Sequence, residues 1–393
     1  MSSLPAVTTI SDGDAFAALA DEWDGLVVAM PRPSPFLLHG WLCAWWREYG
    51  AGRRLAVHVA HENGRLTGAL PLFVQRRFGV RVARMLGEDA AALSDVLVAR
   101  DAHPATAGLL VEHASAGGAH LADVFGLAAD SALAQRLRLI ERAEAPVLDL
   151  TAGWDAVYRE RTSSKRRSLH RRRRRQLEEL GDVTFAVARE PAALAAALEE
   201  AFRLHEARWR DRPEASGFAT PAGRRFHRAA LRALAPGGVA RIALLRVAGR
   251  AVACNYYFVL GDRMYFHELA FDPEFARCSP GQVTTLETLA AAAADGVKHV
   301  EFLGGAERYK LELADRLEPL YQGLGLASGP RGRAAVAILA ASVRTRRRLK
   351  RTPVRRLYYE GLAPARRIAR VASMARSSRR GINAAGRRPA RMP

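Results

Sequence analysis

The sequence predicts an α/β protein, with mixed α+β sheets, in which two tandem domains of the same design pack helices on their sheets. Three observations support this prediction: the length of 393 residues, a strand, turn, helix and strand unit over 264–310, and a partial copy of that pattern nearer the N-terminus. A chain of this length can bury two cores of usual domain size. We place the boundaries as follows: 1–155 first domain, 156–181 basic linking helix, 182–327 second domain, 328–393 basic tail.

Charge and cysteine content exclude several classes of protein. The net charge of +20 is concentrated, because residues 328–393 contain 18 Arg and one Lys against Glu360 alone, and residues 161–175 add nine basic side chains without an acid. The rest of the chain is therefore an ordinary acidic globule. Three cysteines are an odd number without metal-ligand spacing, which argues against a disulfide scaffold and a zinc site. No signal-like opening and no run of 18 apolar residues occurs, so we expect a cytoplasmic protein.

The first elements are predicted to be helices over 14–29 and 35–49. Trp41, Trp45 and Tyr49 share one face of the second helix. We assign this aromatic stripe to the core, although aromatic rings also line acyl and sugar pockets.

A hairpin follows, with predicted strands over 55–61 and 68–73 joined at Asn63-Gly64, a strong turn signal. The same design returns later in the chain. Four positions of this hairpin align without a gap on a second one, and three positions after the next helix align at a similar offset. The pairs are Gly64/Gly249, Arg65/Arg250, Phe73/Phe258, Val74/Val259, Gly118/Gly296, Asp123/Glu301 and Gly126/Gly304. This order indicates an internal duplication. The first copy has no glycine turn before its helix, so we expect it to lack a cofactor site.

Residues 161–181 predict a basic helix that Ser163 or Ser164 caps and Gly181 ends. It is basic on all sides, and both a solvated helix and a phosphate-binding helix remain open. Helices are also predicted over 191–235, where His205 and Trp209 lie four residues apart on one face. A lone histidine on such a face is more often structural, and His205 is kept as a pocket candidate.

The chain is organised around residues 264–310. A strand over 264–271 leads through a turn to a helix, with Ser279 as the expected N-cap and Pro280 at the first helical position. A second strand over 298–303 and a short helix with Tyr309 and Lys310 follow. The free N–H groups at such a helix start suit a phosphate, although strand-turn-helix joints are also common without a ligand.

This unit resembles the acyl-CoA-binding signature of the GNAT acyltransferase superfamily. Phe271-x-Pro273 and Gly281 fall in register with it, whereas Ala276 stands where the family has Gln or Arg and Ser279 where it has its first Gly. Over residues 30–327 the ordered set of motifs resembles the bacterial acetyltransferases associated with cellulose and exopolysaccharide biosynthesis, which are double-GNAT proteins related to the Fem-type transferases. The motifs are Pro35-Phe36, Trp41, Trp45-Trp46, the Lys165 to Leu177 helix, His205-x-x-x-Trp209, Ser279-Pro280-Gly281 and Phe302-Leu303-Gly304-Gly305-x-Glu307-x-Tyr309-Lys310.

The resemblance implies an acyltransferase with two tandem GNAT-like domains that moves an acyl group from acetyl-CoA, or another acyl-CoA, to an amine of a sugar or cell-envelope precursor. An alkyl amine attacks only when it is neutral, so the site needs a base. The catalytic candidates are Glu268 and Glu301 as bases, Tyr309 as the acid for the leaving thiolate, and Lys310 as a ligand of a substrate carboxylate or phosphate. The cofactor-binding candidates are Phe271, Ser279, Pro280, Gly281 and Gln282. The substrate-binding candidates are His205, Trp209 and His267, and no metal is expected.

Two other functions and a membrane partner also follow from the sequence. A Fem-type enzyme would take an aminoacyl group from tRNA, with Arg171 to Arg175 on phosphates. A non-catalytic protein would bind nucleic acid or polysaccharide machinery with a degenerate GNAT fold. In the tail, residues 334–343 are apolar but too short to span a bilayer, and arginines follow at once. We therefore expect peripheral contact with an anionic membrane, with a solubilising tail and a nucleic-acid arm as alternatives.

Overall fold

The fold is taken from a computed structural model, in which one compact unit comprises residues 1–210 and 215–340. The structure describes residues 4–77, 79–88, 90, 92–210, 218, 220–304, 308–327 and 329–350. Residues 351–393 of the predicted tail and Glu307 of the resemblance lie outside this description. No helix of the described residues is long and apolar enough to cross a membrane.

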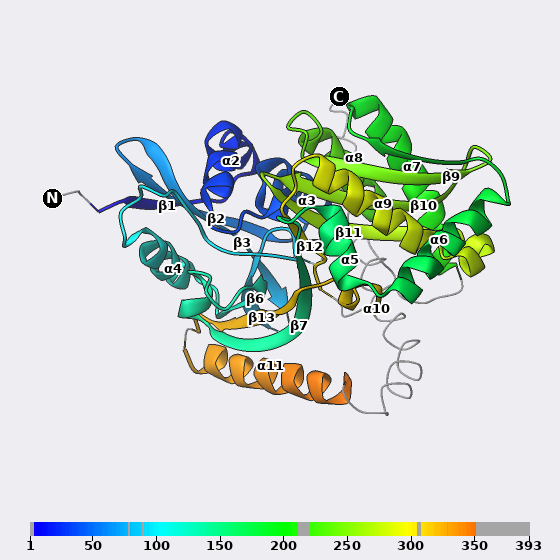
Figure 1. Cartoon of the computed structure of the whole chain (residues 1–393). Coiled ribbons are helices and arrows are strands. Elements are labelled where there is room, and N and C mark those ends of the chain that lie inside the picture. Colours follow the sequence, from blue (N-terminus) through cyan, green and yellow to red (C-terminus); the bar gives the residue numbers. More distant parts are fainter. Residues whose placement is uncertain are drawn as a thin grey trace, which may run out of the picture. The chain divides into compact units, whose positions relative to one another are not determined.

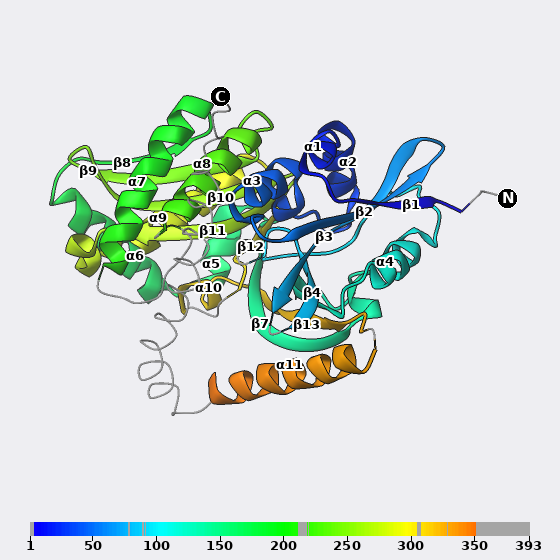
Figure 2. The ribbon, with the colours of Figure 1, turned by 180° about the vertical axis from the view of Figure 1, so that it is seen from behind.

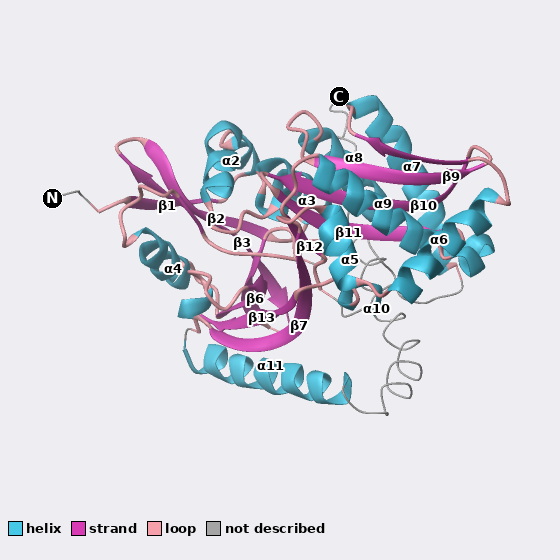
Figure 3. Cartoon of the chain, viewed as in Figure 1, coloured by secondary structure: helices cyan, strands magenta, loops and turns pink. Residues whose placement is uncertain are grey.

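Thirteen strands of the described residues form one mixed sheet (Figure 3). The strands are β1 (Ala6–Ile10), β2 (Arg54–Glu62), β3 (Arg65–Arg77), β4 (Val80–Met85), β5 (Leu97–Val98), β6 (Leu121–Leu127), β7 (Arg138–Asp149), β8 (Val183–Ala188), β9 (Ala240–Val247), β10 (Arg250–Leu260), β11 (Arg263–Phe271), β12 (His299–Glu301) and β13 (Arg316–Gly325). Their order across the sheet is β1-β2-β3-β4-β6-β13-β7-β12-β11-β10-β9-β8, with β5 paired to β3. The predicted α/β class with a mixed sheet is confirmed.

The helices connect these strands in a repeating order. The α-helices are α1 (Gly13–Ala17), α2 (Ala20–Ala29), α3 (His39–Tyr49), α4 (Thr106–Ala116), α5 (Trp154–Arg161), α6 (Ser164–Glu178), α7 (Pro191–Trp209), α8 (Pro221–Leu234), α9 (Pro280–Ala294), α10 (Arg308–Leu311) and α11 (Gly329–Lys350). Short 3-10 helices are η1 (Pro35–Leu37), η2 (Ala134–Arg136) and η4 (Pro273–Cys278). The predicted helix over 14–29 is two helices, α1 and α2, and the predicted helix over 35–49 begins as η1 before α3.

The two halves of the chain repeat one topology. In the first half, β2, β3 and β4 pair antiparallel, α4 follows, and β6 returns parallel to β4. In the second half, β9, β10 and β11 do the same, and β12 returns after α9 parallel to β11. The hairpin turns also match, since Asn63 and Gly64 have φ of 52° and 79°, and Ala248 and Gly249 have φ of 48° and 79°. The tandem arrangement inferred from the sequence is therefore present in the fold.

The halves exchange their last strands, which the sequence did not indicate. β7 follows the first half but pairs with β12 of the second, and β13 follows the second half but pairs with β6 of the first. β7 and β13 also pair with each other along most of their length, from Arg316↔Val147 to Leu324↔Arg138. The exchange makes one continuous sheet, because each half ends on a strand supplied by the other. The domain boundaries drawn from the sequence stay a prediction.

Helices cover both faces of the second half of the sheet. Figures 1 and 2 show α5, α6 and α9 on one face and α7 and α8 on the other. The first half contacts this second group through α3, which crosses α8 closely: a Cβ on Gly40 would lie 2.7 Å from the Ala233 Cβ. Any larger side chain at position 40 would push the two helices apart. α3 therefore brings side chains of the first half to the second half of the sheet.

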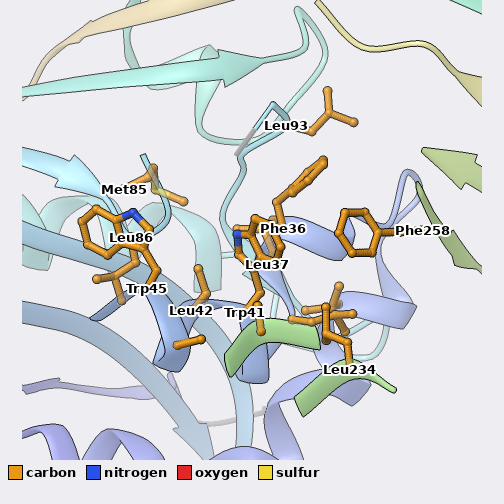
Figure 4. Close-up of a cluster of buried hydrophobic side chains, with 14 of the residues drawn as sticks. Phe36, Leu37, Trp41, Leu42, Trp45, Met85, Leu86, Leu93, Leu234 and Phe258 are labelled. Carbon is orange, nitrogen blue, oxygen red and sulfur yellow. The ribbon is translucent and has the colours of Figure 1, made fainter. Parts of the chain in front are cut away.

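The aromatic stripe of α3 lies in the core, as the sequence predicted. Trp41 and Trp45 are 0% and 2% exposed. The Trp41 ring contacts Phe36 of η1 and Phe258 of β10 edge to face, with ring centroids 5.5 and 5.4 Å apart (Figure 4). Such aromatic pairs add to the stabilisation that comes from buried area.

Candidate functional site

The candidate site lies where β11 and β12 separate. The two strands pair in parallel only from Arg263↔His299 to Tyr265↔Glu301. β12 ends at Glu301, whereas β11 continues to Phe271. Within the described residues, no strand pairs with this edge of β11 beyond Tyr265, and farther along β11 the Leu269 carbonyl accepts from Arg208. An opening of this kind exposes N–H groups that can hold a ligand or an oxyanion.

A β-bulge lies at the start of this opening. In the ladder with β10, Tyr257 opposes Phe266 while Tyr256 opposes Glu268, so His267 is the extra residue. Because of the bulge, His267 and Glu268 both contact helices of the same face: His267 meets His227 of α8, and Glu268 meets His205 of α7. Bulges of this kind often re-aim side chains beside active sites. The sequence offered no signal for it.

Glu268 has the electrostatics of a base. Burial raises the pKa of Glu268 to about 7, although Arg208 and Lys310 act in the opposite direction. The side chain is still 22% exposed, and its Oε1 lies 3.8 Å from His205 Nε2. A carboxyl group with this pKa is partly ionised at neutral pH and accepts a proton readily there. Burial thus gives the Glu268 carboxyl a pKa suited to accepting a proton near neutrality, and its role as a base stays a prediction.

The predicted substrate residues gather beside Glu268. His205 and Trp209 lie on α7 with ring centroids 6.0 Å apart, and His267 packs against His227 at 5.2 Å. Burial lowers the pKa of His205 and of His267 to about 4 each. Both imidazoles are therefore neutral at pH 7. Neutral rings here present hydrogen-bonding groups without adding charge near Glu268.

Glu301, the other predicted base, is held in ion pairs. It is fully buried, and Arg32 contacts both its oxygens, Nε to Oε1 at 2.9 Å and Nη2 to Oε2 at 2.6 Å. Arg263 Nη1 donates to the same Oε1 at 2.9 Å. Both oxygens of this carboxylate are therefore engaged by charge-assisted hydrogen bonds from guanidinium groups. These contacts favour a structural role, and Glu301 has no part in the mechanism proposed below.

The turn before α9 differs in detail from the expected helix start. Ser279 is in the left-handed conformation with φ of 51°, and its side chain makes no capping hydrogen bond, contrary to the expected N-cap. Asp272 caps the preceding short helix η4 instead, where it accepts from Glu274 N at 3.1 Å and contacts Arg250. Gly281 is buried against β11, because an added Cβ would lie 3.2 Å from side-chain atoms of Leu269 and Phe271. Glycine at 281 therefore lets α9 approach the open edge of β11.

The basic helix α6 packs beside the start of α9. Ser163 caps it, accepting from Arg166 N at 3.3 Å. On the side that faces α9, His170 Nε2 accepts from the Gln282 amide at 3.0 Å, and Arg173 contacts the same amide. Burial, together with Arg166 and Arg172, lowers the pKa of Arg173, which shows that positive charge gathers here. The sequence predicted helix α6 but gave no indication that it packs beside the start of α9.

A cavity between α6, α9 and α10 lies beside these basic side chains of α6. It is lined by Thr162, Arg166, His170, Gln282, Thr285, Leu286, Tyr309, Glu312 and Leu313. Tyr309 therefore faces the side of α9 where the predicted cofactor residues lie. Its neighbour Lys310 is 8% exposed and lies close enough to Glu268 to lower that carboxyl's pKa. α10 thus brings Tyr309 to the cavity beside α9 and Lys310 to Glu268.

The equivalent opening of the first half is filled. The segment after β4 folds back onto β6, with Ser94 N donating to Gly126 O at 2.9 Å. Gly126 has φ of 87°, and a Cβ there would lie 2.7 Å from Ala92 O. Ser34 Oγ donates to Leu93 O at 3.1 Å and closes the segment from the other side. The segment after β4 therefore occupies the place that stays without a partner in the second half, and the expected lack of a cofactor site in the first half stays a prediction.

Comparison with known proteins agrees with this geometry. Residues 164–311, which include α6 and the whole opening, match the model of the acetyltransferase (GNAT) domain family. A search of curated proteins finds no match. Among solved structures, FemX aligns with a TM-score of 0.56 and 11% identity over 81% of this chain and 96% of that one. The C-terminal domain of a putative lysylphosphatidylglycerol synthetase from Agrobacterium fabrum aligns with a TM-score of 0.53 and 16% identity over 84% and 97%.

A conserved protein of unknown function from Bacteroides thetaiotaomicron aligns with a TM-score of 0.52 and 13% identity over 82% of this chain and 100% of that one. At these identities the structural matches show a shared fold. The fold has two halves of the same topology. Residues 164–311, which match the acetyltransferase (GNAT) domain family, make up less than half of the chain and include the open-edged part of its second half.

Proposed function

We propose that this protein is an N-acyltransferase that takes its acyl group from an acyl-CoA and gives it to an amine of a sugar or a cell-envelope or exopolysaccharide precursor. The observation that carries the proposal is Glu268, a partly accessible carboxyl with a pKa of about 7 at the bulge where β11 leaves β12. It lies inside the residues that match the acetyltransferase domain.

The chemistry needs three proton transfers around one substitution. Glu268 takes a proton from the ammonium group of the acceptor, directly or through a water, and so frees the nitrogen lone pair. The nitrogen attacks the thioester carbon, and backbone N–H groups of the open β11 edge and the turn after Phe271 stabilise the oxyanion. The intermediate collapses with cleavage of the C–S bond, and Tyr309 protonates the departing thiolate of CoA. The nitrogen gives up its second proton to the Tyr309 oxygen, directly or through a water, which leaves the neutral amide and restores the tyrosine.

Donor binding is proposed at the start of α9. Pro280, Gly281 and Gln282 form the first helical turn, where free N–H groups and the helix dipole favour a phosphate. Ala276 supplies no charge there, and Arg166 and Arg173 of α6 are the neighbouring cations. Lys310, buried beside Glu268, is proposed to bind an acidic group of the acceptor.

One observation favours a second candidate, a Fem-type transfer from aminoacyl-tRNA. The outward face of α6 carries cations that make no ion pair within the described part of the chain, namely Lys165, Arg171, Arg172 and Arg175. A row of this kind suits nucleic-acid phosphates. A non-catalytic protein with the same fold would bind such a polymer without turning over a donor.

Direct binding measurements separate these candidates. We expect calorimetry to detect acetyl-CoA binding, and mass spectrometry of ligand released from the purified chain to find CoA or an acyl-CoA. Gel-shift titration with total tRNA is the matched measurement for the second candidate. Binding of tRNA with no heat for acetyl-CoA would replace the first proposal with the second. Absence of both, with retained binding to a polysaccharide or nucleic acid, would support the non-catalytic alternative.

A further inference from the structure

A cavity of about 290 Å³ lies where the two halves of the chain meet at the start of β11. The first half supplies Arg32 and residues 128–130, which follow β6. The second half supplies Arg263, the first residue of β11, and part of β13. This cavity shares no lining residue with the one beside Tyr309. Its volume lies at the lower end of the range for ligand pockets, so it suits a small molecule.

Five charged side chains form a chain of ion pairs along this cavity. Arg263 Nη1 lies 2.9 Å from Glu301 Oε1, and Arg32 binds both oxygens of Glu301. Arg32 Nη1 also lies 2.5 Å from Glu318 Oε2, and Arg316 Nε lies 2.9 Å from Glu318 Oε1. Cations and carboxylates therefore alternate, and the chain of ion pairs begins and ends on an arginine.

The strand register brings these side chains to one face of the sheet. Arg316 and Glu301 both pair with Val147 of β7, one from each side. Residues that oppose each other on neighbouring strands point to the same face. Glu301 in turn pairs with Tyr265 of β11. The Tyr265 hydroxyl donates to the carbonyl of Pro33, which follows the first-half arginine, and so holds that arginine against this face.

The chain of ion pairs carries an excess of positive charge, because three guanidinium groups face two carboxylates. The side chains of Arg32 and Arg263 are only 23% and 17% exposed, so water compensates this charge incompletely. Hydrogen-bond donors also remain at both ends. Within the described residues, Arg263 Nε and Nη2 and both Nη atoms of Arg316 have no protein partner. A carboxylate bound between Arg263 and Arg316 would neutralise the excess charge and accept from these donors.

The rest of the wall adds one acid and three apolar residues. Asp130 lines the cavity, is exposed, and makes no ion pair within the part of the chain that the structure describes. A positive group of a ligand would be attracted to it. Ala128, Ala129 and Pro319 contribute apolar side chains. The cavity therefore offers places for a carboxylate, for an ammonium group and for a small hydrocarbon group.

We propose that this cavity binds a small aliphatic α-amino acid in its zwitterionic form. Its carboxylate accepts from Arg263 and Arg316, its ammonium group donates to Asp130, and its side chain packs on the three apolar residues. A carboxylate alone would lie near Asp130 without a positive group between them, so the zwitterion suits the whole wall better. Glu268 lies five residues after Arg263 on β11, or about 15 Å along a strand, so this site goes beyond the proposed acyl transfer. A bound amino acid would tie the two halves together.

Three probes with one carbon skeleton separate the two charges of the ligand. L-Leucine carries both charges, 4-methylpentanoate carries only the carboxylate, and isopentylamine carries only the ammonium group. Calorimetry with the full chain at pH 7 should detect leucine binding, and weaker binding of the other two compounds. Leucine should also raise the unfolding temperature, because it binds only the folded chain. Inorganic phosphate is the fourth probe, and tighter binding of phosphate than of leucine would overturn the proposal.

Two variants place the two charges. Arg316→Gln changes a half-exposed side chain, and it should weaken leucine and 4-methylpentanoate alike by about tenfold. Asp130→Asn should weaken leucine by about threefold and should not weaken 4-methylpentanoate. Arg138→Gln is the control, because Arg138 is an exposed arginine at the opposite end of β7 from Val147, and it should bind leucine as the wild type does.

Leucine binding that is absent in the wild type, or equal in the wild type and Arg316→Gln, would overturn the site. Equal affinity of the wild type for leucine and 4-methylpentanoate would also overturn it, because the ammonium group would then have no role. Acetyl-CoA affinity is measured on the same samples and should not change in Arg316→Gln or Asp130→Asn. The outcome for this site is therefore distinct from the outcome for the proposed donor.

Discussion

At the scale of single residues, proton transfer depends on how burial tunes Glu268. A carboxyl in water is ionised far below neutral pH and holds a proton too weakly to be an efficient base at pH 7. Burial brings the pKa of Glu268 to about 7, against the opposing effect of Arg208 and Lys310. His205 faces it from α7 and stays neutral, with a pKa of about 4. Of Glu268 and His205, it is therefore Glu268 that changes its protonation state near neutral pH.

Replacement of Glu268 with Gln should lower kcat/KM by about 10²- to 10⁴-fold, because it removes the base and keeps the shape. The sign of the pH dependence follows from the raised pKa: activity is low while Glu268 is protonated, rises tenfold per pH unit below pH 7, and levels above it. This rise of activity below pH 7 should be absent in Glu268→Gln. Glu199→Gln, an exposed carboxylate of α7 paired with Arg228, is the control. A wild-type limb that persists in Glu268→Gln would assign the base elsewhere.

Tyr309→Phe tests the proposed general acid. The side chain lines the cavity beside α9, so loss of its hydroxyl should slow departure of the thiolate and leave binding nearly intact. We expect kcat to fall by about 10²- to 10⁴-fold with a modest change in KM. Tyr321→Phe on β13 is the matched control. An unchanged kcat in Tyr309→Phe, measured where chemistry limits the rate, would remove this tyrosine from the mechanism.

At the scale of elements, the site depends on how closely α9 approaches β11. Gly281 permits that approach, since its place against Leu269 and Phe271 leaves no free room for a methyl group. Ser279 pays a conformational cost to start the helix there, because a left-handed residue with a side chain is strained by about 1 kcal/mol or more. The turn is thus shaped by packing as well as by its proposed ligand.

Gly281→Ala should weaken acetyl-CoA binding by about tenfold, because the methyl group would crowd Leu269 and Phe271 beside the N–H groups proposed to hold the donor. Alanine is the suitable change, since a branched side chain such as valine would meet Leu269 and Phe271 more severely and endanger the fold. The measurement is calorimetry, with thermal unfolding to confirm that the protein is intact. Gly25→Ala in α2, where an added Cβ meets nothing within 4 Å, is the control, and it should bind acetyl-CoA as well as the wild type. Equal affinity in Gly281→Ala and the wild type would exclude close contact of the donor with this turn.

At the scale of the whole molecule, the exchange of β7 and β13 joins the halves. Tyr321 on β13 pairs with Leu127 of β6, although the two are far apart in the chain. β7 in turn closes β12 with Glu301↔Val147. Neither half can complete its sheet alone, because an interior strand is missing from each and its neighbours would become exposed edges.

Separate expression of the halves tests this dependence. The fragment 1–155 lacks β13, and the fragment 156–350 lacks β7, so we expect neither to show a cooperative thermal transition alone. Co-expressed fragments should associate and melt together in one transition, which is also what we expect of the intact chain. Circular dichroism and size-exclusion chromatography provide the readout. A fragment 1–155 that melts cooperatively by itself would show that the first half folds independently of β13.

The tail is proposed to contact an anionic membrane. Residues 334–343 lie within α11, where Ile338 is 69% exposed, and arginines follow. Burial of apolar surface and about 1 kcal/mol per engaged basic residue would hold such a segment at an anionic interface. The full chain should sediment with anionic but not neutral vesicles, and less so at high salt. A chain that ends at Ala327 keeps β13 intact and should stay in solution, whereas equal sedimentation of both chains would show that the tail is not the anchor.

Local signals made much of the fold and part of the site predictable. Asn63-Gly64 predicts its hairpin because few residue pairs adopt two successive left-handed conformations. Ser163 predicts the start of α6 because its hydroxyl accepts from a free N–H group of the first helical turn. The strand that ends at Phe271 and the helix that begins at Pro280 follow from the same short-range rules. Glu268 was predictable as a candidate, since a carboxylate inside an apolar strand carries its own desolvation cost.

The remaining features depend on contacts between distant parts of the chain. Arg32 contacts Glu301, which lies 269 residues later in the chain. This ion pair distinguishes Glu301 from Glu268, the other carboxylate that the sequence offered as a base. The bulge at His267 exists only through the register with β10, and Trp41 meets it only because Gly40 lets α3 approach α8. The sequence contains short-range preferences for each element, but packing free energy selects among the long-range pairings. Strand exchange, the surroundings of Glu268 and the contact of Trp41 with His267 are therefore properties of the folded chain.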